Sequence, residues 1–326
     1  MKLSAQQQFH ATWGDLNDPH VRALVWLLTS PHLLHSGSPI WNGADIAPVL
    51  PDASAMRGFL QALDLDPAPL HAALAKHPTK RLGLYAETLL AFFLGQFCDL
   101  YAHGLQIHDD KARTIGEFDF LVRHGHRLSH WELATKFYLF FQSDELAVDG
   151  EQADLFDYLG PNLADTLGAK MHKIVHQQLR LSEHPQACSQ LALPVASAQA
   201  LIKGWLFYRD PLAMEASNFV DGVAVDHCRG YIWRLSDLRD MPEFSGVTLD
   251  RLMWLAPAQV PIGETLGKDQ LITKTEAQFG LIKTPVMLAI TEAQNGYARE
   301  VCRGMVVPDD WWQQATEARR RLAPLA

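Results

Sequence analysis

The stretch TIGEFDFLVRHGHRLSHWELATKFYLF, residues 114–140, predicts two long β-strands joined by one tight turn. β-Branched and aromatic residues, which pack well on a pleated surface, fill the two runs Thr114–Val122 and Leu128–Phe140. Between the runs, Gly125 can adopt the positive φ that a type II′ turn requires at its first central residue. With Gly125 and His126 at the centre of the turn, the register of the hairpin follows.

This register places Asp119 directly opposite Glu132 on one face of the hairpin. Cross-strand partners have Cβ atoms about 4.5 to 5.5 Å apart, and like charges at that distance destabilise a sheet. A metal cation between the two carboxylates would remove this repulsion, so the pair predicts a metal site. Glu117 and Lys136 fall on the same face. The opposite face is predicted to carry the apolar side chains of Phe118, Phe120, Trp131, Leu133 and Phe137.

The composition indicates a globular protein with one large core or two modest ones. The chain has 326 residues, of which 48% are hydrophobic, and no segment is both long and apolar enough to span a bilayer. The first residues lack the apolar run of a signal peptide, and the four cysteines show no close pairing. We therefore expect a soluble, cytoplasmic protein without structural zinc and without a membrane partner.

The net charge limits the classes of function. A formal charge of −9 and a pI near 5.9 argue against a protein that coats nucleic acid with its whole surface, because phosphate contacts need clustered Lys and Arg. An enzyme that grips nucleic acid locally is compatible with this charge, since its catalytic carboxylates add to the negative sum.

Turn signals and hydrophobic periodicity predict an α/β (α+β) fold with three regions. Residues 1–80 form an N-terminal helical region, residues 81–210 a core, and residues 211–326 a C-terminal extension packed on that core. Besides the hairpin, the core is predicted to contain helices over Leu82–Cys98 and Leu163–Leu181 and strands over Leu100–His108 and Ile202–Arg209. Within the extension, Ala256–Gly280 is predicted to be a loop.

Glu87 is the only charged residue of the predicted helix Leu82–Cys98, which is apolar on nearly every side. A carboxylate is rarely buried unless it is paired or bound to a metal, and no counter-charge lies three or four residues from Glu87. Two interpretations remain open: a metal ligand, or a structural carboxylate that accepts from a backbone amide or from Arg81.

The predicted helix Leu163–Leu181 has an apolar side and a basic side. Asn162 or Asp165 would cap its start. Its apolar side carries Leu167, Met171, Ile174, Val175 and Gln178, and its basic side carries Lys170, Lys173, Gln177 and Arg180. A stripe of this kind is often only a solvated face. In a chain of charge −9 it is still the best candidate for contact with nucleic-acid phosphates.

The predicted order of elements resembles the PD-(D/E)XK nuclease superfamily. In this order a helix with a buried Glu precedes three strands, of which the second carries GxxD and the third Glu and Lys, and a helix and a strand follow. The blocks GEFDFLV, HWELATKFYL, KGWLFYR and GMVVPDDWW are also similar to a bacterial family of unknown function grouped with that superfamily. The resemblance to the superfamily covers about residues 82–209. It implies a restriction-endonuclease-like αβββαβ core on a mixed sheet, with an N-terminal helical cap and a C-terminal α+β extension.

By position, the resemblance implies that Glu87, Asp119 and Glu132 hold Mg²⁺ or Mn²⁺ and that Lys136 completes the catalytic set. One feature departs from the family's pattern. The lysine usually lies two residues after the acid, where this chain has Ala134, and Lys136 lies four residues after it. In an extended strand this spacing separates the Cα atoms of Glu132 and Lys136 by roughly 13 Å.

Four explanations of the displaced lysine remain open. A bulge could shorten the strand, or Lys136 could lean back over the small Ala134. A lysine of the following helix, Lys170 or Lys173, could reach the site in its place. Alternatively, Lys136 pairs with Glu117 across the hairpin and the site has lost its activity.

The leading functional hypothesis is a metal-dependent nuclease that uses Mg²⁺ or Mn²⁺ and acts on DNA rather than RNA. The alternative is an inactive nuclease-like fold that serves as a nucleic-acid-binding or assembly module. A third interpretation combines His124, His126 and His130 with Glu132 into a transition-metal site. It is the weakest, because His124 and His126 flank the glycine of the turn.

Overall fold

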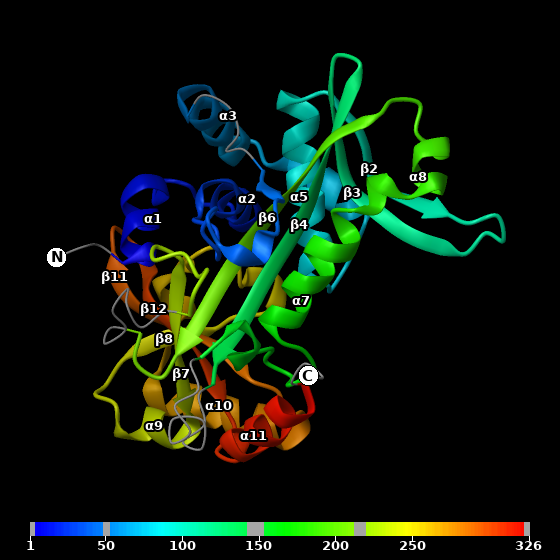
Figure 1. Ribbon diagram of the computed structural model, residues 1–326. Helices are drawn as coiled ribbons and strands as arrows, with labels where there is room; N and C mark the ends of the chain where they lie inside the picture. The colour runs from blue at the N-terminus through cyan, green and yellow to red at the C-terminus, as the bar shows by residue number, and fades with distance from the viewer. Residues whose placement is uncertain (1–3, 48–52, 142–152, 212–219, 323–326) are drawn as a thin grey trace.

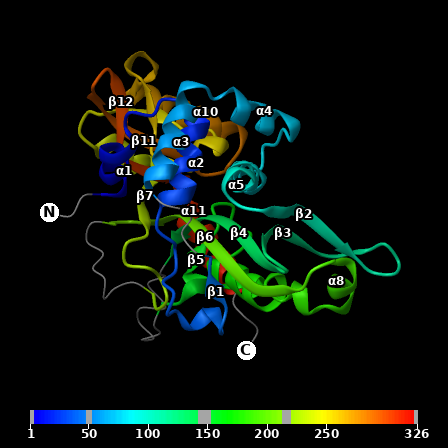
Figure 2. The same cartoon turned by 90° about the horizontal axis from the view of Figure 1, so that it is seen from above.

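The computed structural model of the chain describes residues 4–47, 53–141, 153–211 and 220–322. It shows a mixed α/β fold in which helices cover both faces of a large mixed sheet (Figure 1 and Figure 2). The helices are α1 (Ala5–Trp13), α2 (Pro19–Thr29), α3 (Ala53–Leu65), α4 (Ala68–Lys76), α5 (Leu82–Phe97), α7 (Leu167–Lys173), α8 (Pro185–Gln190), α9 (Leu235–Asp240), α10 (Lys268–Leu281) and α11 (Trp311–Leu322). The strands are β1 (Asp45–Ile46), β2 (Leu100–His108), β3 (Thr114–His124), β4 (Arg127–Phe140), β5 (Tyr158–Leu159), β6 (Val195–Tyr208), β7 (Cys228–Arg234), β8 (Ser245–Thr248), β9 (Gln259–Pro261), β10 (Leu266–Gly267), β11 (Val286–Gln294) and β12 (Tyr297–Val307).

Within the described residues, the strands follow the order β10-β8-β11-β12-β7-β6-β4-β3-β2 across the sheet. The centre, from β4 through β6 and β7 to β12, is parallel, and both flanks are antiparallel. The long strands β4 and β6 cross the molecule side by side in Figure 1. The strands within residues 228–307 therefore belong to the same sheet as the strands of the predicted core.

The hairpin predicted at residues 114–140 is present and has the predicted register. β3 and β4 pair from Phe120 with Trp131 to His124 with Arg127. Gly125 has a φ of 61°, and His126 does not share this positive φ, as a type II′ turn requires.

The predicted division of the hairpin faces is wrong at Phe118. This ring packs in the cluster that contains Leu121 and Leu128, whereas Phe120 packs on the opposite side with Trp131. The reason lies on β2, where Gly104, between the partners of Phe118 and Phe120, has a φ of 64°. This left-handed residue interrupts the pleat, so the alternation of faces changes at Asp119.

Local signals account for the helices that surround the hairpin. α2 begins at Pro19, and Oδ1 of Asp18 accepts hydrogen bonds from the N–H groups of His20 and Val21. α5 buries Tyr85, Leu89 and Phe93, among others, against α2 and one face of the sheet. No helix in the described part of the chain combines the length and the apolarity needed to cross a membrane.

Two of the predicted elements need correction. The predicted helix Leu163–Leu181 begins only at Leu167, behind the cap Thr166, because Leu163 adopts a left-handed φ of 55°. After Lys173 it continues as η3, a π-helical turn over Ile174–Gln178. The predicted loop Ala256–Gly280 contains most of α10, whose buried side chains, Leu271, Ile272 and Thr275, do not form a long apolar stripe.

Candidate active site

β3 and β4 separate directly beyond the Phe120–Trp131 pair, and Asp119 lies at the fork between them. In a continued ladder, the N–H of Leu133 would donate to the carbonyl of Phe118. It donates to Oδ2 of Asp119 instead, at 2.9 Å. Beyond the Phe120–Trp131 pair, β3 remains paired with β2, and β4 remains paired with its parallel partner β6. The Asp119 side chain thus terminates the β3–β4 ladder.

Three acids lie within electrostatic range of one another at this fork: Asp119 from β3, Glu132 from β4 and Glu87 from α5. Asp119 is 9% exposed and Glu132 is 3% exposed, while Glu87 is half-buried. The carboxyl groups of Asp119 and Glu132 lie close enough for each to shift the pKa of the other. Glu87 lies close enough to interact electrostatically with both. The structure therefore brings together the three acids that the sequence predicts.

Burial raises the pKa of all three carboxyl groups. It raises the pKa of Glu87 to about 7, and the nearby Asp119 and Glu117 add to the effect. For Asp119 and Glu132, burial and then a neighbouring carboxylate hold the pKa well above the usual carboxyl range. Within the described residues, no Arg or Lys forms an ion pair with any of the three. When these carboxyl groups ionise, no Arg or Lys of the described residues therefore neutralises their charge in an ion pair.

Gln178 is a site residue that the sequence patterns missed. Its side-chain amide, on η3, donates a hydrogen bond to Oε1 of Glu132. The N–H of Leu179 bonds to the carbonyl of Ile174, five residues back, so this turn is wider than an α-helical one. Helical periodicity had placed Gln178 on the apolar side of its helix. A polar side chain on the apolar side of a helix indicates a buried hydrogen-bond partner, and this was the one signal in the sequence that pointed to Gln178.

Lys136 lies within electrostatic range of the carboxylates and of Lys170. Burial lowers the pKa of Lys136, and Lys170 lowers it further, while Asp165, Glu132 and Asp119 act in the opposite direction. Pairing with β6 is continuous from Glu132 to Lys136, so no bulge shortens the strand between them.

Gly204 of β6 lies opposite Lys136 and has a φ of 151°. A Cβ at this position would lie 1.7 Å from the backbone oxygen of Lys136. Only glycine therefore allows β6 to approach β4 at the lysine.

Pairing of Lys136 with Glu117 is also not observed. Glu117 accepts a hydrogen bond from Nε2 of Gln106 on β2 at 3.2 Å, and the described residues contain no ion pair between Glu117 and Lys136. Lys170 of α7 is a second lysine near the site, with its Nζ 3.9 Å from Oδ2 of Asp165. The Tyr138 hydroxyl donates to the same Asp165 oxygen at 3.0 Å. Lys136 leaning toward the acids and Lys170 reaching in from the helix therefore remain the two explanations that the geometry accommodates.

The residues of the predicted basic stripe differ in exposure and in pairing. Lys173 and Gln177 are exposed and available to a ligand, whereas Lys170 is half-buried beside Asp165. The guanidinium of Arg180 donates to Oε2 of Glu183 from Nε at 2.9 Å and from Nη2 at 2.7 Å. The charge of Arg180 is therefore compensated locally.

One family model, described as Domain of unknown function (DUF1853), matches residues 22–307. The chain belongs to the DUF1853 family. No curated protein and no solved structure gives a significant match to the DUF1853 chain.

The donors at the fork of this DUF1853 chain fit a hard divalent cation that keeps part of its water shell. Carboxylate oxygens suit Mg²⁺ and Mn²⁺, and the buried Oε2 of Glu132 has no hydrogen-bond partner. In the part of the chain that the structure describes, no group of three or more His, Cys, Asp or Glu side chains is arranged to hold a metal ion. Mg²⁺ is often bound through one or two carboxylates, with water and substrate phosphate as its other ligands. Asp119 and Glu132 are the pair that would hold it.

The histidines near the DUF1853 site do not form the alternative transition-metal site. His130 is fully buried, and burial lowers its pKa to about 4, so its ring is neutral. Its Nε2 lies 3.6 Å from Oε2 of Glu132, beyond hydrogen-bond distance. His124 and His126 are exposed at the turn.

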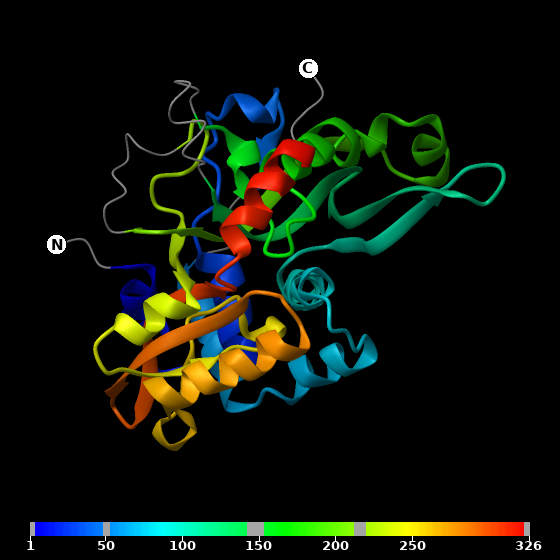
Figure 3. The same ribbon diagram turned by 90° about the horizontal axis from the view of Figure 1, so that it is seen from below.

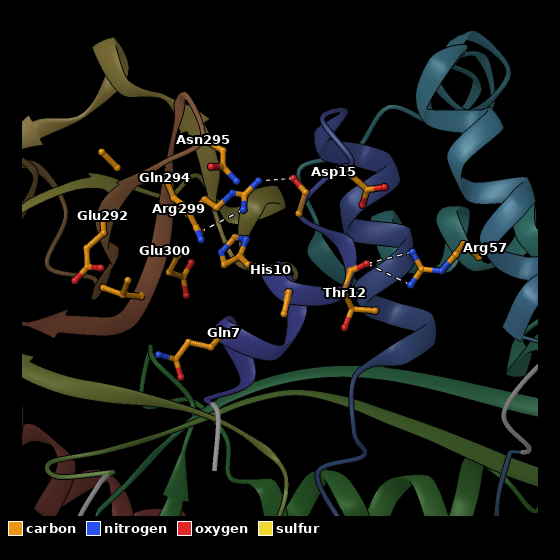
Figure 4. A pocket seen from close by; sticks show the side chains of 14 residues that line it. Gln7, His10, Thr12, Asp15, Arg57, Glu292, Gln294, Asn295, Arg299 and Glu300 are labelled. Carbon is orange, nitrogen blue, oxygen red and sulfur yellow. Dashed lines mark hydrogen bonds between the residues drawn. The ribbon is translucent and has the colours of Figure 1, made fainter. Parts of the chain in front are cut away.

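A cavity of about 870 Å³ lies apart from the fork, between α1 and the tip of the β11–β12 hairpin (Figure 4). It contains none of the predicted site residues. Its two arginines contact backbone carbonyls: Arg57 donates to Thr12, and Arg299 donates to Gly14. We therefore place the candidate active site at the fork.

Proposed function

We propose that this chain is a metal-dependent nuclease that hydrolyses phosphodiester bonds with Mg²⁺ or Mn²⁺. The observation that carries the proposal is the group of Asp119, Glu132 and Glu87, three neighbouring carboxyl groups that have raised pKa values and, among the described residues, no ion pair with an Arg or Lys. Buried acids that remain uncompensated mark functional sites more often than structural ones.

The order of elements supports the same proposal. α5, β2, β3, β4, α7 and β6 occur in this order along the chain, with the short elements β5 and α8 inserted before α7 and before β6. The αβββαβ core of the PD-(D/E)XK nuclease superfamily, which the sequence resembles, has the same order. The acids lie on the corresponding elements. DNA is the preferred substrate on the grounds of this resemblance.

The chemistry would be divided between the ion and the chain. When bound, the ion would polarise the phosphate and lower the pKa of a coordinated water. The N–H groups of Leu133 and Gln178 orient the carboxylates of Asp119 and Glu132 while leaving Oε2 of Glu132 open. The ammonium of Lys136 would stabilise the charge on the phosphate as the water oxygen bonds to phosphorus and the ester P–O bond breaks.

A cleavage assay tests the proposal. The purified chain is incubated with single- and double-stranded DNA and RNA in the presence of Mg²⁺, Mn²⁺ or EDTA, beside Asp119→Asn and Glu132→Gln. We expect metal-dependent cleavage that falls at least about 1000-fold in both variants, because each removes a charged metal ligand. Asp269→Asn, which alters an exposed carboxylate of α10, is the matched control and should retain full activity. Cleavage that persists in Asp119→Asn at the wild-type rate would rule out this site.

The displaced lysine favours a second candidate, an inactive nuclease-like fold that binds nucleic acid or assembles with other proteins. Titration with Mg²⁺ or Mn²⁺, followed by calorimetry, separates the two candidates. The nuclease should bind the ion through Asp119 and Glu132 and lose this binding in Glu132→Gln. A chain that binds nucleic acid but neither binds the ion nor cleaves would belong to the second class.

A further inference from the structure

The connection between α4 and α5 carries a cluster of cations that the nuclease proposal does not use. Lys76, His77, Lys80 and Arg81 lie within six consecutive residues, and all four are exposed. None of them takes part in an ion pair with another described residue. In a chain of net charge −9, such a group of unpaired cations is unusual. We call these residues, 76–81, the α4–α5 loop.

The α4–α5 loop lies at the Glu87 side of the fork. The side chain of Glu87 points back toward the start of α5, since a Cβ on Gly83 would lie 3.7 Å from its Oε1. Arg81, the residue before α5, lies near enough to lower the pKa of Glu87. In Figure 3 the loop joins α4 to the start of α5.

A second electrostatic neighbour helps to place the other end of the loop. Burial lowers the pKa of His103 on β2, and His77 lies near enough to lower the pKa of His103 further. The ring of His103 stacks on Phe120 at 5.1 Å, and Phe120 is the neighbour of Asp119. The loop therefore lies beside the strand that leads to the acids. Lys136 also lies near the acids, and Lys170 lies near Lys136.

We propose that the α4–α5 loop binds the phosphate backbone of a nucleic acid on the Glu87 side of the site. This inference rests on the proposed function and adds a binding surface to it. A polyanion is the ligand that fits the loop, because the cationic side chains of the loop attract phosphate groups. A metal cation would bind at the carboxylates, and the loop would repel it. Because cations of the loop and of α7 both lie near the acids, one backbone can contact Lys80 and Arg81 together with Lys173.

The test measures binding without cleavage. Fluorescence anisotropy with labelled single- and double-stranded DNA, in EDTA, compares wild type with Lys80→Glu/Arg81→Glu across a range of salt concentrations. We expect affinity at low salt to fall about 10-fold or more. The slope of log K against log salt should decrease by about 2, because two phosphate contacts are lost.

Two control variants separate the loop from general effects of charge. Lys274→Glu/Lys283→Glu changes the net charge equally on and just after α10, well away from α5 in Figure 1, and should retain most of the wild-type affinity. Lys80→Arg/Arg81→Lys preserves the charge and should bind as wild type. Circular dichroism checks that each variant folds, which the exposure of these positions favours.

The outcomes distinguish this inference from the nuclease proposal. Unchanged affinity in Lys80→Glu/Arg81→Glu, or an equal loss in the α10 control, overturns the role of the loop. Absence of any binding by wild type overturns it as well. Specific loss of binding in a protein that never cleaves supports the loop and contradicts the nuclease. Metal-dependent cleavage with unaltered binding in the loop variant contradicts only the loop.

Discussion

Two buried glutamates of the same sheet have opposite surroundings. Glu300 of β12 is 1% exposed, and both of its oxygens have partners. Arg303 donates to Oε1 from Nε at 2.6 Å and to Oε2 from Nη2 at 2.8 Å, and the N–H of Ala258 also donates to Oε2 at 2.8 Å. Glu132 is 3% exposed, yet it accepts from Gln178 through one oxygen and leaves the other without a partner.

Arg303 is compensated as completely as Glu300. Its remaining N–H groups donate to the carbonyls of Trp254 and Ala256, and its guanidinium lies 4.1 Å from the centre of the Trp205 ring. At the fork, by contrast, Glu132 has other acids as neighbours. Burial of a carboxylate is therefore not itself a functional signal. The distinguishing property is whether side chains of the same protein neutralise the charge or leave it to an external cation.

The largest effect is expected when the compensated pair is broken. Arg303→Met leaves the charge of Glu300 buried and unpaired, as at the fork, and should lower the free energy of unfolding by about 3–5 kcal/mol. Equilibrium unfolding in urea at neutral pH measures this loss. The double variant Glu300→Gln/Arg303→Met removes both charges and should recover part of it. A loss below about 1 kcal/mol in Arg303→Met would contradict the structural role of the pair.

The next effect concerns the lysine beside the uncompensated acids. Lys136→Met should reduce cleavage about 100-fold or more and leave Mg²⁺ affinity nearly unchanged, because an ammonium stabilises the transition state but is not a metal ligand. Single-turnover cleavage and calorimetric titration provide the two readouts. Ala134→Lys restores the usual spacing, and increased cleavage would show that the displacement weakens the native site. Full activity in both Lys136→Met and Lys170→Met/Lys173→Met would refute every lysine assignment.

Removing one acid should have opposite consequences at the fork and at the Glu300–Arg303 pair. Asp119→Asn should stabilise the metal-free protein at pH 8 by about 2 kcal/mol, because it removes a buried charge and Asn can still accept from Leu133. Glu300→Gln should destabilise it, since Arg303 loses its partner. Thermal unfolding in EDTA measures both variants.

The stabilisation by Asp119→Asn should depend on pH. The folded pKa values of Asp119 and Glu132 lie above their unfolded values, so between these values the folded state binds more protons. The stability of the metal-free wild type should therefore fall as the pH rises from about 5 to about 8. The gain from Asp119→Asn should be largest at pH 8 and disappear near pH 5, and Mg²⁺ should restore stability to the wild type at pH 8. An equal gain at both pH values would rule out charge repulsion as its cause.

The smallest effect is expected on the surface of η3 and the residues around it. Lys173→Gln should weaken nucleic-acid binding about 2- to 3-fold at low salt, with one phosphate contact less in the salt slope. Arg180→Gln/Glu183→Gln removes a compensated pair and should leave affinity unchanged. Anisotropy titrations of the two variants measure these affinities. An equal loss of affinity in both variants would show that Arg180 also contacts the nucleic acid.

Local sequence patterns predicted the hairpin, its register and the buried helix α5. A two-residue turn on Gly125 sets which residues of adjacent strands face each other, so the approach of Asp119 to Glu132 follows from the chain between them. The same patterns failed at Phe118 and at α10. At Phe118, a left-handed glycine of the neighbouring strand changes the alternation, and α10 buries too few apolar residues to show a helical period.

The sequence by itself therefore determined the pair of acids and the strands that carry them, because turn geometry and alternation act over short distances along the chain. The tertiary structure alone decided which groups complete the site. Gln178, which is 46 residues from Glu132 in the chain, reaches that residue through a π-helical turn. Gly204 of β6, 68 residues after Lys136, allows the backbones of β4 and β6 to approach closely at the lysine. Contacts of this kind depend on how separate elements pack against one another, and no periodicity within a single element encodes that packing.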